Sequence, residues 1–478
     1  MSTQHSNSKM NRREFLRLAA VGGAGLATTA SGLQFASARR LQENIAYIRF
    51  LTQETDPAEV QAHRNNIRNF EAAHADMRVE LQLTGAQQIV AQMIASLNAG
   101  VSSLDVLQPN PATAFGVAAQ DMLLPIDDLV EDIGGDAFFY GDTVMRLNGV
   151  SYGVPFAGGT VLLWYRKDLF EADGIEIPTT WEELEAVARH FTKQFNPDSP
   201  TDYGIGLPYS KDGSTAFNVA PFWWSNGADY FDKDLNIAFE SDETAEFLDW
   251  YGSMYQYVPP AATGWSWGDL INTFLSGQSA MTVYLGRVLS RVYSNAPQLV
   301  GNIGVFPYPK RKLLITQDDP NYLVINAKTA VPDASKEFVK YLITGDVANE
   351  FLCTVPGHLP PATQDELAWW SQTTTGCQIL DENPEIKQVI SDSVAYANFS
   401  TGNAGGVLEA VSQGLDRVVR TGIANPMQMI PDVTLLTLPS AIQEVVLNGK
   451  SGRDAMLSVV GDLEQGVAQM KQDLNWGV

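Results

Sequence analysis

Strand-like and helix-like patterns alternate between residues 44 and 107, and this alternation restricts the possible folds more than any other feature. Asp56 and Pro57 predict the start of a helix, because Asp caps helices and Pro suits their first turn. Strand patterns occupy residues 45–51, 77–83 and 104–107. This order of strands and helices predicts an α/β fold whose mostly parallel sheet is covered by helices on both faces.

The carboxyl ends of these strands are the expected location of a ligand, as in other open α/β sheets. The loops that follow the strands hold polar side chains at residues 52–55, 85–88 and 108–110. From these loops we predict ligand contacts by Thr52, Gln53, Gln87 and Asn110.

Composition and charge narrow the class of protein. The chain has 478 residues, of which 45% are hydrophobic and 18% charged, so it can form two or three globular domains. Its formal net charge of −24 repels nucleic acid and anionic lipid, and we expect neither as a partner. We expect the chain to act as a monomer.

The first 38 residues resemble a twin-arginine export signal. Arg12 and Arg13 precede an apolar run over residues 18–30, which is too short to span a membrane, and residues 36–38 have the small-residue pattern of a cleavage site. We therefore predict a periplasmic or other extracytoplasmic protein, with the signal either cleaved or kept as an anchor. No Cys follows the apolar run closely, so we expect no lipoprotein.

A second strong pattern lies between Tyr152 and Phe191. Thr180 and Glu183 predict a capping box that starts a helix, and Trp181 falls on the apolar face of that helix. An apolar, strand-like run and a charged step precede the cap, so the segment passes from strand to helix.

This segment resembles the crossing between the lobes of carbohydrate-binding proteins of ATP-driven importers, the family 1 solute-binding proteins related to maltose-binding protein. Arg166 stands where the family usually has Asn. Further stretches resemble the family in the same order, at residues 274–281, 303–309, 357–360 and 446–467. The resemblance thus extends over about 430 residues, from Ile45 to near the C-terminus.

The resemblance implies a two-lobe, type II periplasmic-binding-protein-like fold, with a mostly parallel sheet in each lobe and a ligand cleft between them. Lobe 1 would comprise residues 39–157 and 311–356, and lobe 2 residues 158–310 and 357–478. The three crossings imply hinge residues at Gly158, Gly159, Thr160, Pro307 and Gly357.

Aromatic side chains favour a sugar ligand, because aromatic faces stack on the C–H face of a sugar while polar groups bind its hydroxyls. Two polar, Gly-containing stretches of the expected second lobe hold tryptophans. They predict contacts by Trp223, Trp224, Asn226, Trp265, Trp267 and Asp269. Packing in the core is the alternative for each tryptophan.

In the family, residues after the stretch that ends at Met281 often face the ligand, which implies roles for Tyr284, Gly286 and Arg287. Family members commonly have Trp near the position of Arg287. The arginine favours an acidic or highly hydroxylated ligand, or an ion pair between the lobes. His358 lies at the third crossing, as a hinge residue or as a ligand contact.

No catalytic or metal-binding pattern is evident in the sequence. The five histidines include no pair at metal-ligand spacing, and no GxSxG motif is present. We therefore predict no enzymatic activity, no metal and no cofactor. Cys353 and Cys377 are the only cysteines, and they either form a disulfide or remain two thiols.

Together these patterns predict the solute-binding component of an ABC importer, which captures a mono- or short oligosaccharide by hinge closure and delivers it to a membrane permease. One alternative keeps the fold and binds a polyol, a glycerophosphodiester, a polyamine or a metal. The others are an exported carbohydrate-active enzyme and a structural or sensory surface protein. The sequence leaves open which sugar and which permease are involved.

Overall fold

The computed structural model describes residues 45–84, 91–92, 95–96, 103–109, 111–118, 120–139, 144–147, 149–156, 159–232, 236–318, 321–394, 406–415, 417–421 and 431–473. The export signal predicted at residues 1–38 lies outside these ranges. Within them, no helix combines the length and apolar character needed to cross a membrane. From Ala46 onward the chain forms one compact unit.

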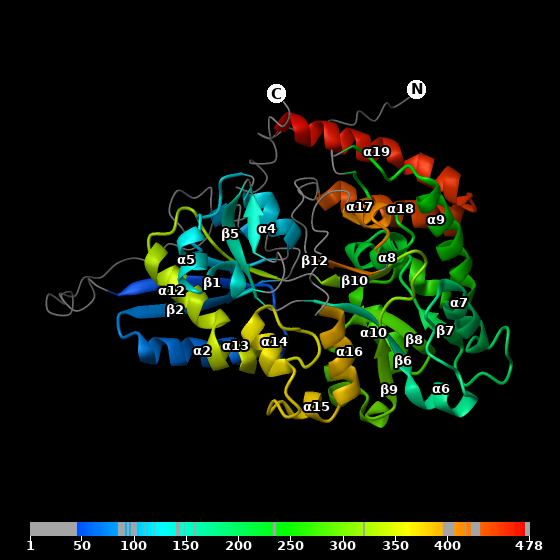
Figure 1. The fold of residues 1–478 in the computed structure, drawn as a ribbon, viewed down its shortest axis with the longest axis horizontal. Helices are drawn as coiled ribbons and strands as arrows, with labels where there is room; N and C mark the ends of the chain where they lie inside the picture. Colours follow the sequence, from blue (N-terminus) through cyan, green and yellow to red (C-terminus); the bar gives the residue numbers. More distant parts are fainter. Residues whose placement is uncertain are drawn as a thin grey trace, which may run out of the picture. The chain divides into compact units, whose positions relative to one another are not determined.

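The larger sheet has six strands in the order β2-β1-β3-β11-β5-β4 (Figure 1). Its strands are β1 (Ala46–Thr52), β2 (Met77–Leu83), β3 (Val106–Gln108), β4 (Met145–Leu147), β5 (Val150–Pro155) and β11 (Tyr322–Ile325). Strand β1 is parallel to β2 and β3, which confirms the predicted alternation in its first part. The sheet is mixed rather than mostly parallel, because β11 joins it antiparallel to β3 and β5, and β4 antiparallel to β5.

Helix α2 (Pro57–Ala73) begins where the sequence predicts it. Asp56 is its N-cap and accepts a hydrogen bond from the Ala58 amide at 3.1 Å. Phe70 of α2 meets Phe338 of α12 with ring centroids 5.1 Å apart, so the two helices share one core. The other helices of this part are α4 (Pro111–Ala118), α5 (Asp127–Asp132), α12 (Pro332–Ile343), α13 (Gly345–Leu352) and α14 (Gln364–Trp370).

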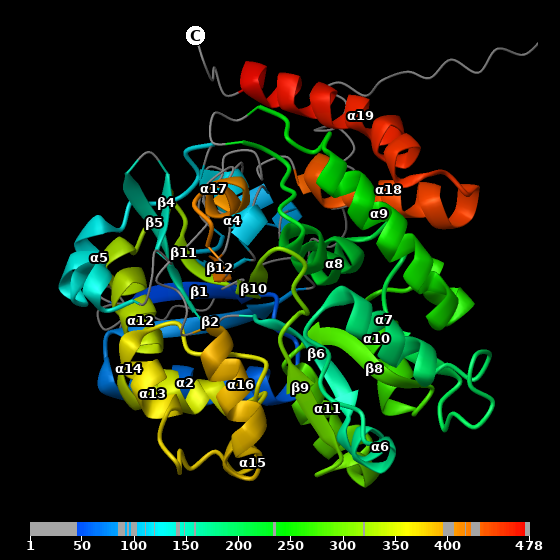
Figure 2. The ribbon, with the colours of Figure 1, turned by 45° about the vertical axis from the view of Figure 1, so that its right-hand side comes forward.

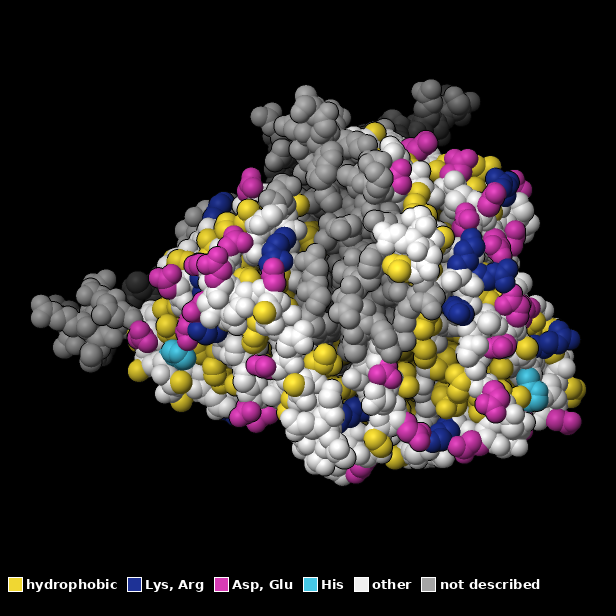
Figure 3. All heavy atoms as spheres, in the orientation of Figure 1, with side chains coloured by type: hydrophobic (Ala, Val, Ile, Leu, Met, Phe, Trp, Pro, Cys, Tyr) yellow, Lys and Arg dark blue, Asp and Glu magenta, His cyan; other side chains and the backbone are white. Residues whose placement is uncertain are grey.

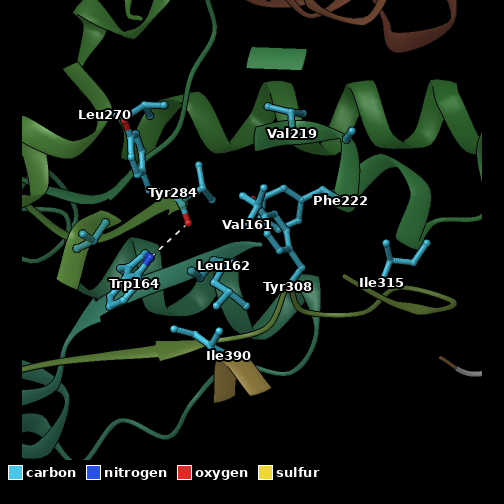
Figure 4. Packing of buried hydrophobic residues seen from close by; sticks show 14 of the residues in the cluster. Val161, Leu162, Trp164, Val219, Phe222, Leu270, Tyr284, Tyr308, Ile315 and Ile390 are labelled. Carbon is cyan, nitrogen blue, oxygen red and sulfur yellow. Dashed lines mark hydrogen bonds between the residues drawn. The ribbon is translucent and has the colours of Figure 1, made fainter. Parts of the chain in front are cut away.

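The second sheet has four strands in the order β7-β8-β6-β9. Its strands are β6 (Val161–Arg166), β7 (Tyr203–Gly206), β8 (Ser279–Leu285) and β9 (Ile303–Phe306). This sheet is mixed as well, since only β7 and β8 run parallel, while β6 is antiparallel to β8 and β9. Trp164 of β6 is fully buried, and its Nε1 donates to the Tyr284 carbonyl oxygen at 3.3 Å (Figure 4).

The helices beside the second sheet begin with α6 (Lys167–Asp173) and α7 (Trp181–His190). The predicted capping box is confirmed, because Thr180 Oγ1 accepts from the Glu183 amide and the Glu183 carboxylate accepts from the Thr180 amide. The next helices are α8 (Gly213–Ser225), α9 (Asp242–Met254), α10 (Trp267–Leu275) and α11 (Arg287–Asn295). Helices α18 (Pro431–Asn448) and α19 (Gly452–Asp473) pack against α9, as Figures 1 and 2 both show.

The chain passes between the two sheets more than once. It leaves the six-stranded sheet after β5 and enters the four-stranded sheet at β6, then leaves that sheet after β9 and returns through β11. The remaining elements are the parallel pair β10 (Leu314–Asp318) and β12 (Arg417–Thr421), and the helices α15 (Gln378–Asp381), α16 (Pro384–Val394) and α17 (Gly406–Ser412). Acidic side chains are spread over the described parts of the face in Figure 3, in keeping with the net charge.

Candidate functional site

The carboxyl end of β1 carries consecutive polar residues, including the predicted Thr52 and Gln53. The buried Thr52 hydroxyl donates to Gln108 Oε1 at the end of neighbouring β3, at 2.7 Å. Gln53 Nε2 donates to Asn321 Oδ1 at 3.3 Å, and Asn321 Nδ2 donates to Glu54 Oε1 at 2.9 Å. These bonds hold side chains from three neighbouring chain segments together at one edge of the six-stranded sheet.

The first turn of α2 adds two more acidic side chains beside Glu54. Asp56 caps the helix, and Glu59 follows one turn later with its side chain fully buried. Burial, and after it the charge of Glu54, raises the pKa of Glu59 to about 9. The Glu59 carboxyl is therefore neutral at pH 7 and can both donate and accept hydrogen bonds.

Helix α11 brings two arginines to these acids. Arg287 Nη1 lies 3.1 Å from Asp56 Oδ2, and Arg287 Nη2 lies 3.4 Å from Glu54 Oε2 and 3.6 Å from Glu59 Oε2. Arg291 Nη2 lies 3.2 Å from Asp56 Oδ2. We call these five residues the charged cluster. Because α11 follows β8 and the acids follow β1, the cluster joins the two sheets, which agrees with the ion pair that was one alternative for Arg287.

A close backbone contact brings a histidine to the charged cluster. A Cβ atom on Gly286 would lie 1.4 Å from the Gly357 carbonyl oxygen, so only glycine fits at position 286. Gly357 itself has φ +85°, in the left-handed region that favours glycine. His358 follows directly, and one of its ring nitrogens lies within 4.8 Å of carboxylate oxygens of Glu54 and Glu59.

His358 is 8% exposed, and its Nδ1 atom has no hydrogen-bond partner among the residues that the structure describes. Burial lowers the pKa of His358 well below its usual value, and the charges of Arg287 and Arg291 lower it further. The imidazole is therefore neutral at pH 7, with one nitrogen able to accept a hydrogen bond or a metal ion.

Several buried polar atoms around the charged cluster have no hydrogen-bond partner in the described part of the chain. They are Gln53 Oε1, both carboxyl oxygens of Glu59, Gln108 Nε2 and His358 Nδ1. Each such atom costs about 1–3 kcal/mol when it is left unpaired, and native proteins rarely gather several of them. Their proximity therefore marks the carboxyl end of β1 as the candidate site, where a ligand rich in hydroxyl groups could pair with them.

Two of the predicted aromatic residues lie together near α11. Tyr284 of β8 is 6% exposed and meets Trp267 edge to face, with ring centroids 5.9 Å apart at 87°. Trp267 is half-buried at the start of α10, and its ring also contacts Phe217. Figure 4 shows Tyr284 with Leu270 beside its ring. Burial raises the pKa of Tyr284, so its hydroxyl is neutral at pH 7.

Trp223 and Asn226 have structural roles that differ from the predicted ones. Trp223 is fully buried in the last turn of α8, and its Nε1 donates to Thr244 Oγ1 at 3.0 Å. Asn226 is fully buried as the C-cap of α8, where its Nδ2 donates to Glu246 Oε2 at 3.0 Å. Trp223 therefore packs in the core, which was the alternative for each tryptophan, while Asn226 keeps one unpaired atom, Oδ1, in the described part of the chain.

The remaining predicted residues support the site or lie apart from it. Asp269 accepts from the Ser266 amide at 2.9 Å and completes the capping box that starts α10, so Trp267 lies on a helix and not in the predicted loop. Trp224 and Trp265 are buried. Gln87, Asn110 and Gly158 lie outside the described residues.

Three of the predicted hinge residues, Gly159, Thr160 and Pro307, occupy connections between the sheets, while Gly357 lies between α13 and α14. Thr160 is buried directly before β6, next to Gly159, and Pro307 directly follows β9. Their role in motion stays a prediction. The two cysteines, Cys353 and Cys377, are free thiols in the structure.

Sequence reasoning missed Glu59, Arg291 and Asn321, included Glu54 only as part of the polar loop 52–55, and treated Asp56 only as a cap. Glu59 stands three residues after that cap, where a glutamate usually completes a capping box. The local pattern therefore suggested a capping role and gave no indication of its contact with Arg287. The prediction of Arg287 as a site residue was the one signal that could have led to these acidic residues, since a partly buried arginine requires acidic partners.

Known proteins with similar sequences fall in one family. The profile of the family described as bacterial extracellular solute-binding protein matches residues 51–348. YcjN of Escherichia coli is 26% identical over 244 residues, an alignment that covers 49% of this chain and 54% of YcjN. The mannitol-binding protein of Pseudomonas aeruginosa is 24% identical over 307 residues, covering 62% of this chain and 69% of that protein. The chain thus spans about half the length of the first relative.

A solved structure shares the fold. An ABC transporter solute-binding protein from Thermotoga lettingae, bound with α-D-tagatose, superposes with a TM-score of 0.70 at 20% identity. The superposition covers 89% of this chain and 100% of that protein. At this level of identity the similarity establishes the two-sheet α/β architecture.

Proposed function

Because the chain belongs to the family of bacterial extracellular solute-binding proteins, we propose that it captures a small carbohydrate outside the cytoplasm and delivers it to the membrane permease of an ABC importer. The preferred solute is a mono- or short oligosaccharide, with a polyol as the alternative. A mannitol-binding relative and a tagatose-bound structural neighbour support a short, hydroxyl-rich solute. Glycerophosphodiesters and polyamines are the remaining alternatives.

One observation carries this proposal: the unpaired polar atoms of Gln53, Glu59, Gln108 and His358 lie around the charged cluster. They include one amide donor, one amide acceptor and a neutral carboxyl, which are complementary to hydroxyl groups that donate and accept at once. A hydroxylated solute would pair these atoms, whereas an apolar solute would leave them unpaired.

Tyr284 and Trp267 supply the apolar contact that a sugar also needs. Their rings meet at the end of β8, immediately before the Gly286–Arg287 step that reaches the charged cluster. An aromatic edge or face at this position would contact the C–H surface of the solute while the polar atoms bind its hydroxyls.

Capture would proceed by closure of two lobes around the solute. The two-lobe division at residues 39–157 with 311–356 and 158–310 with 357–478 is supported by the two separate sheets and the connections between them. Gly158, Gly159, Thr160 and Pro307 would bend in these connections, and Gly357 would bend between α13 and α14. Closure excludes water, which strengthens each polar contact inside the site.

The export route and the mode of action follow from the same family assignment. Members of an extracellular family act outside the cytoplasm, and Arg12 and Arg13 support export through the twin-arginine route without a lipid anchor. We propose a monomeric binding protein without enzymatic activity, because the family and the structural neighbour are binding proteins.

A thermal-unfolding screen against monosaccharides, disaccharides, longer oligosaccharides, polyols and polyamines tests the proposal. A solute at 100 times its dissociation constant stabilises the folded state by about 2.7 kcal/mol, so it visibly raises the unfolding midpoint. We expect a clear shift for at least one sugar or polyol. The shift should be lost in Trp267→Ala and kept in the matched control Trp369→Ala, another half-buried helical tryptophan far along the chain. A response to polyamines alone would contradict the proposal.

A further inference from the structure

The charged cluster and His358 bring together donor atoms of the kind that bind metal ions. One oxygen of Glu54, one oxygen of Glu59 and one ring nitrogen of His358 lie within 4.8 Å of one another. Ligand atoms at about 2.0–2.2 Å from a tetrahedral ion lie roughly 3.4 Å apart, so the three side chains would have to draw closer together around a bound ion. The two glutamates follow β1, while His358 is held beside them by the Gly286–Gly357 contact, so the three ligands come from distant parts of the chain.

Two of the three ligands, Glu59 and His358, are buried and have atoms without a hydrogen-bond partner in the described part of the chain. Glu59 is fully buried, and neither of its carboxyl oxygens has a hydrogen-bond partner in the described part of the chain. His358 is 8% exposed, and its Nδ1 likewise has none. The buried imidazole of His358, with one nitrogen near the two carboxyl groups, goes beyond what an acidic cluster alone provides, because it adds a ligand suited to metals that accept nitrogen.

Arg287 is the cation that now lies closest to this position. Its Nη2 atom lies 3.4 Å from Glu54 and 3.6 Å from Glu59. These separations are longer than those of strong charge-assisted hydrogen bonds, which are about 2.7–2.9 Å. Arg291 remains paired with Asp56 through a separate contact. Arg287 could therefore move aside without leaving Asp56 uncompensated.

We propose that Glu54, Glu59 and His358 form a binding site for a divalent transition-metal ion such as Zn²⁺, with Arg287 as the resident competitor. The Glu59 carboxyl would release its proton when the ion binds. The resulting set of two carboxylates and one imidazole favours Zn²⁺ over Mg²⁺ and Ca²⁺, which prefer oxygen ligands alone. Three protein ligands leave a coordination position open for water or for a solute oxygen. The site goes beyond the proposed capture of a carbohydrate, although it shares residues with that site.

Isothermal titration of the chelator-treated, full-length protein with ZnCl₂ and with MgCl₂ tests this inference. We expect one Zn²⁺ per chain and no saturable binding of Mg²⁺. Glu59→Gln and His358→Gln should each weaken Zn²⁺ binding at least tenfold, because each removes one ligand while keeping the side-chain volume. Arg287→Gln should strengthen Zn²⁺ binding at least threefold, since it removes the competing cation.

His190→Gln is the matched control. His190 Nε2 lies 2.7 Å from Asp173 Oδ2 at the surface. The variant therefore tests whether Zn²⁺ binds to a surface pair of histidine and carboxylate instead of the proposed site. Zn²⁺ binding that is lost in His190→Gln, or unchanged in both Glu59→Gln and His358→Gln, would overturn the inference, as would the absence of binding at unit stoichiometry. Circular dichroism of each variant verifies that it is folded.

A parallel titration with the best solute of the thermal screen separates this inference from the proposed function. Solute binding without Zn²⁺ binding would overturn the metal site and leave the carbohydrate site intact. Zn²⁺ binding that shows the expected variant effects, without any solute binding, would support the metal site and contradict the carbohydrate proposal.

Discussion

The charged cluster and the aromatic core around α8 and α9 are both buried, yet they differ in the side chains that fill them. Five charged groups meet in the cluster, whereas aromatic rings stack on one another in the core. In the aromatic core the hydroxyls of Tyr209, Tyr251 and Tyr308 donate to carbonyl oxygens at 2.8–2.9 Å, and Trp223 donates to Thr244. Polar atoms without a hydrogen-bond partner in the described part of the chain occur in both regions. They belong to Gln53, Glu59, Gln108 and His358 around the charged cluster, and to Ser214, Asn218 and Trp250 in the aromatic core.

This difference shows that burial and aromatic content do not identify a binding site. The aromatic core is well packed, with Trp181 stacked on Trp250 at a centroid distance of 4.0 Å and an interplanar angle of 16°. Such packing stabilises the fold and leaves little to offer a ligand. The charged cluster keeps unsatisfied hydrogen-bonding capacity, which a ligand can use.

The largest effect is expected in the aromatic core. Trp223→Ala should lower the free energy of unfolding by about 3–5 kcal/mol, because it removes a fully buried ring and leaves a cavity. Equilibrium denaturation with urea measures the change. The protein that remains folded should bind solute within twofold of the wild type. A loss below about 1 kcal/mol would show that Trp223 is not a core residue.

A second test concerns His63, whose ring nitrogens are also unpaired in the described part of the chain but lie in a hydrophobic core. His63 is fully buried against Phe50, Phe156 and Phe351, and burial lowers its pKa to about 3. Below about pH 6.5 the unfolded chain binds a proton that the folded chain does not. The free energy of unfolding should therefore decrease by about 1.4 kcal/mol for each unit by which the pH is lowered from 6.5 toward 3.

Urea denaturation at pH 6.5 and pH 5 measures this effect. We expect His63→Phe to remove about 2 kcal/mol of the pH dependence over this interval. An unchanged pH dependence in His63→Phe would mean that the His63 ring reaches water in the folded state.

Glu59 should make the protein less stable as the pH rises, whereas His63 makes it less stable as the pH falls. Its pKa is raised to about 9, so the folded chain keeps a proton that the unfolded chain loses above about pH 4.5. Stability from this group should decrease by about 1.4 kcal/mol for each pH unit as the pH rises toward 9. Glu59→Gln should remove that slope between pH 7 and 8.5 in urea denaturation of metal-free protein. A slope that persists in the variant would assign the titration to another group.

The smallest expected changes in the free energy of unfolding come from removing one cation, either in the charged cluster or in an ordinary surface ion pair. Arg287→Gln should lower the free energy of unfolding by about 1–2 kcal/mol, because it leaves partly buried carboxylates without their cation. Lys336→Gln removes an exposed contact with Asp128 and should change stability by less than about 0.5 kcal/mol. Equal losses in the two variants would contradict a structural role for the cluster.

Local sequence patterns predicted the elements that local physics determines. Asp56 and Thr180 marked helix starts because capping involves residues only two or three positions apart. The α/β class followed from the alternation of strands and helices. The antiparallel entry of β11 was not predictable, since no local pattern reveals the direction in which a later strand joins a sheet.

The candidate site was only partly predictable because it depends on contacts between distant residues. Thr52, Gln53, Arg287 and His358 were predicted from their place in the chain, and the structure brings them to one region. For Trp223, core packing and ligand contact were both open from the sequence, because its polar and Gly-containing neighbours favoured a contact while its ring suits a core.

Solute affinity of two variants tests the central claim most directly, namely that solute binds at the carboxyl ends of β1 and β3 and not at the aromatic core. Isothermal titration uses the solute with the largest shift in the thermal screen. We predict that Gln108→Met, which removes an unpaired amide donor at the site, weakens binding at least tenfold, while Trp223→Phe binds within twofold of the wild type. Unchanged affinity in Gln108→Met together with a tenfold loss in Trp223→Phe would contradict the claim.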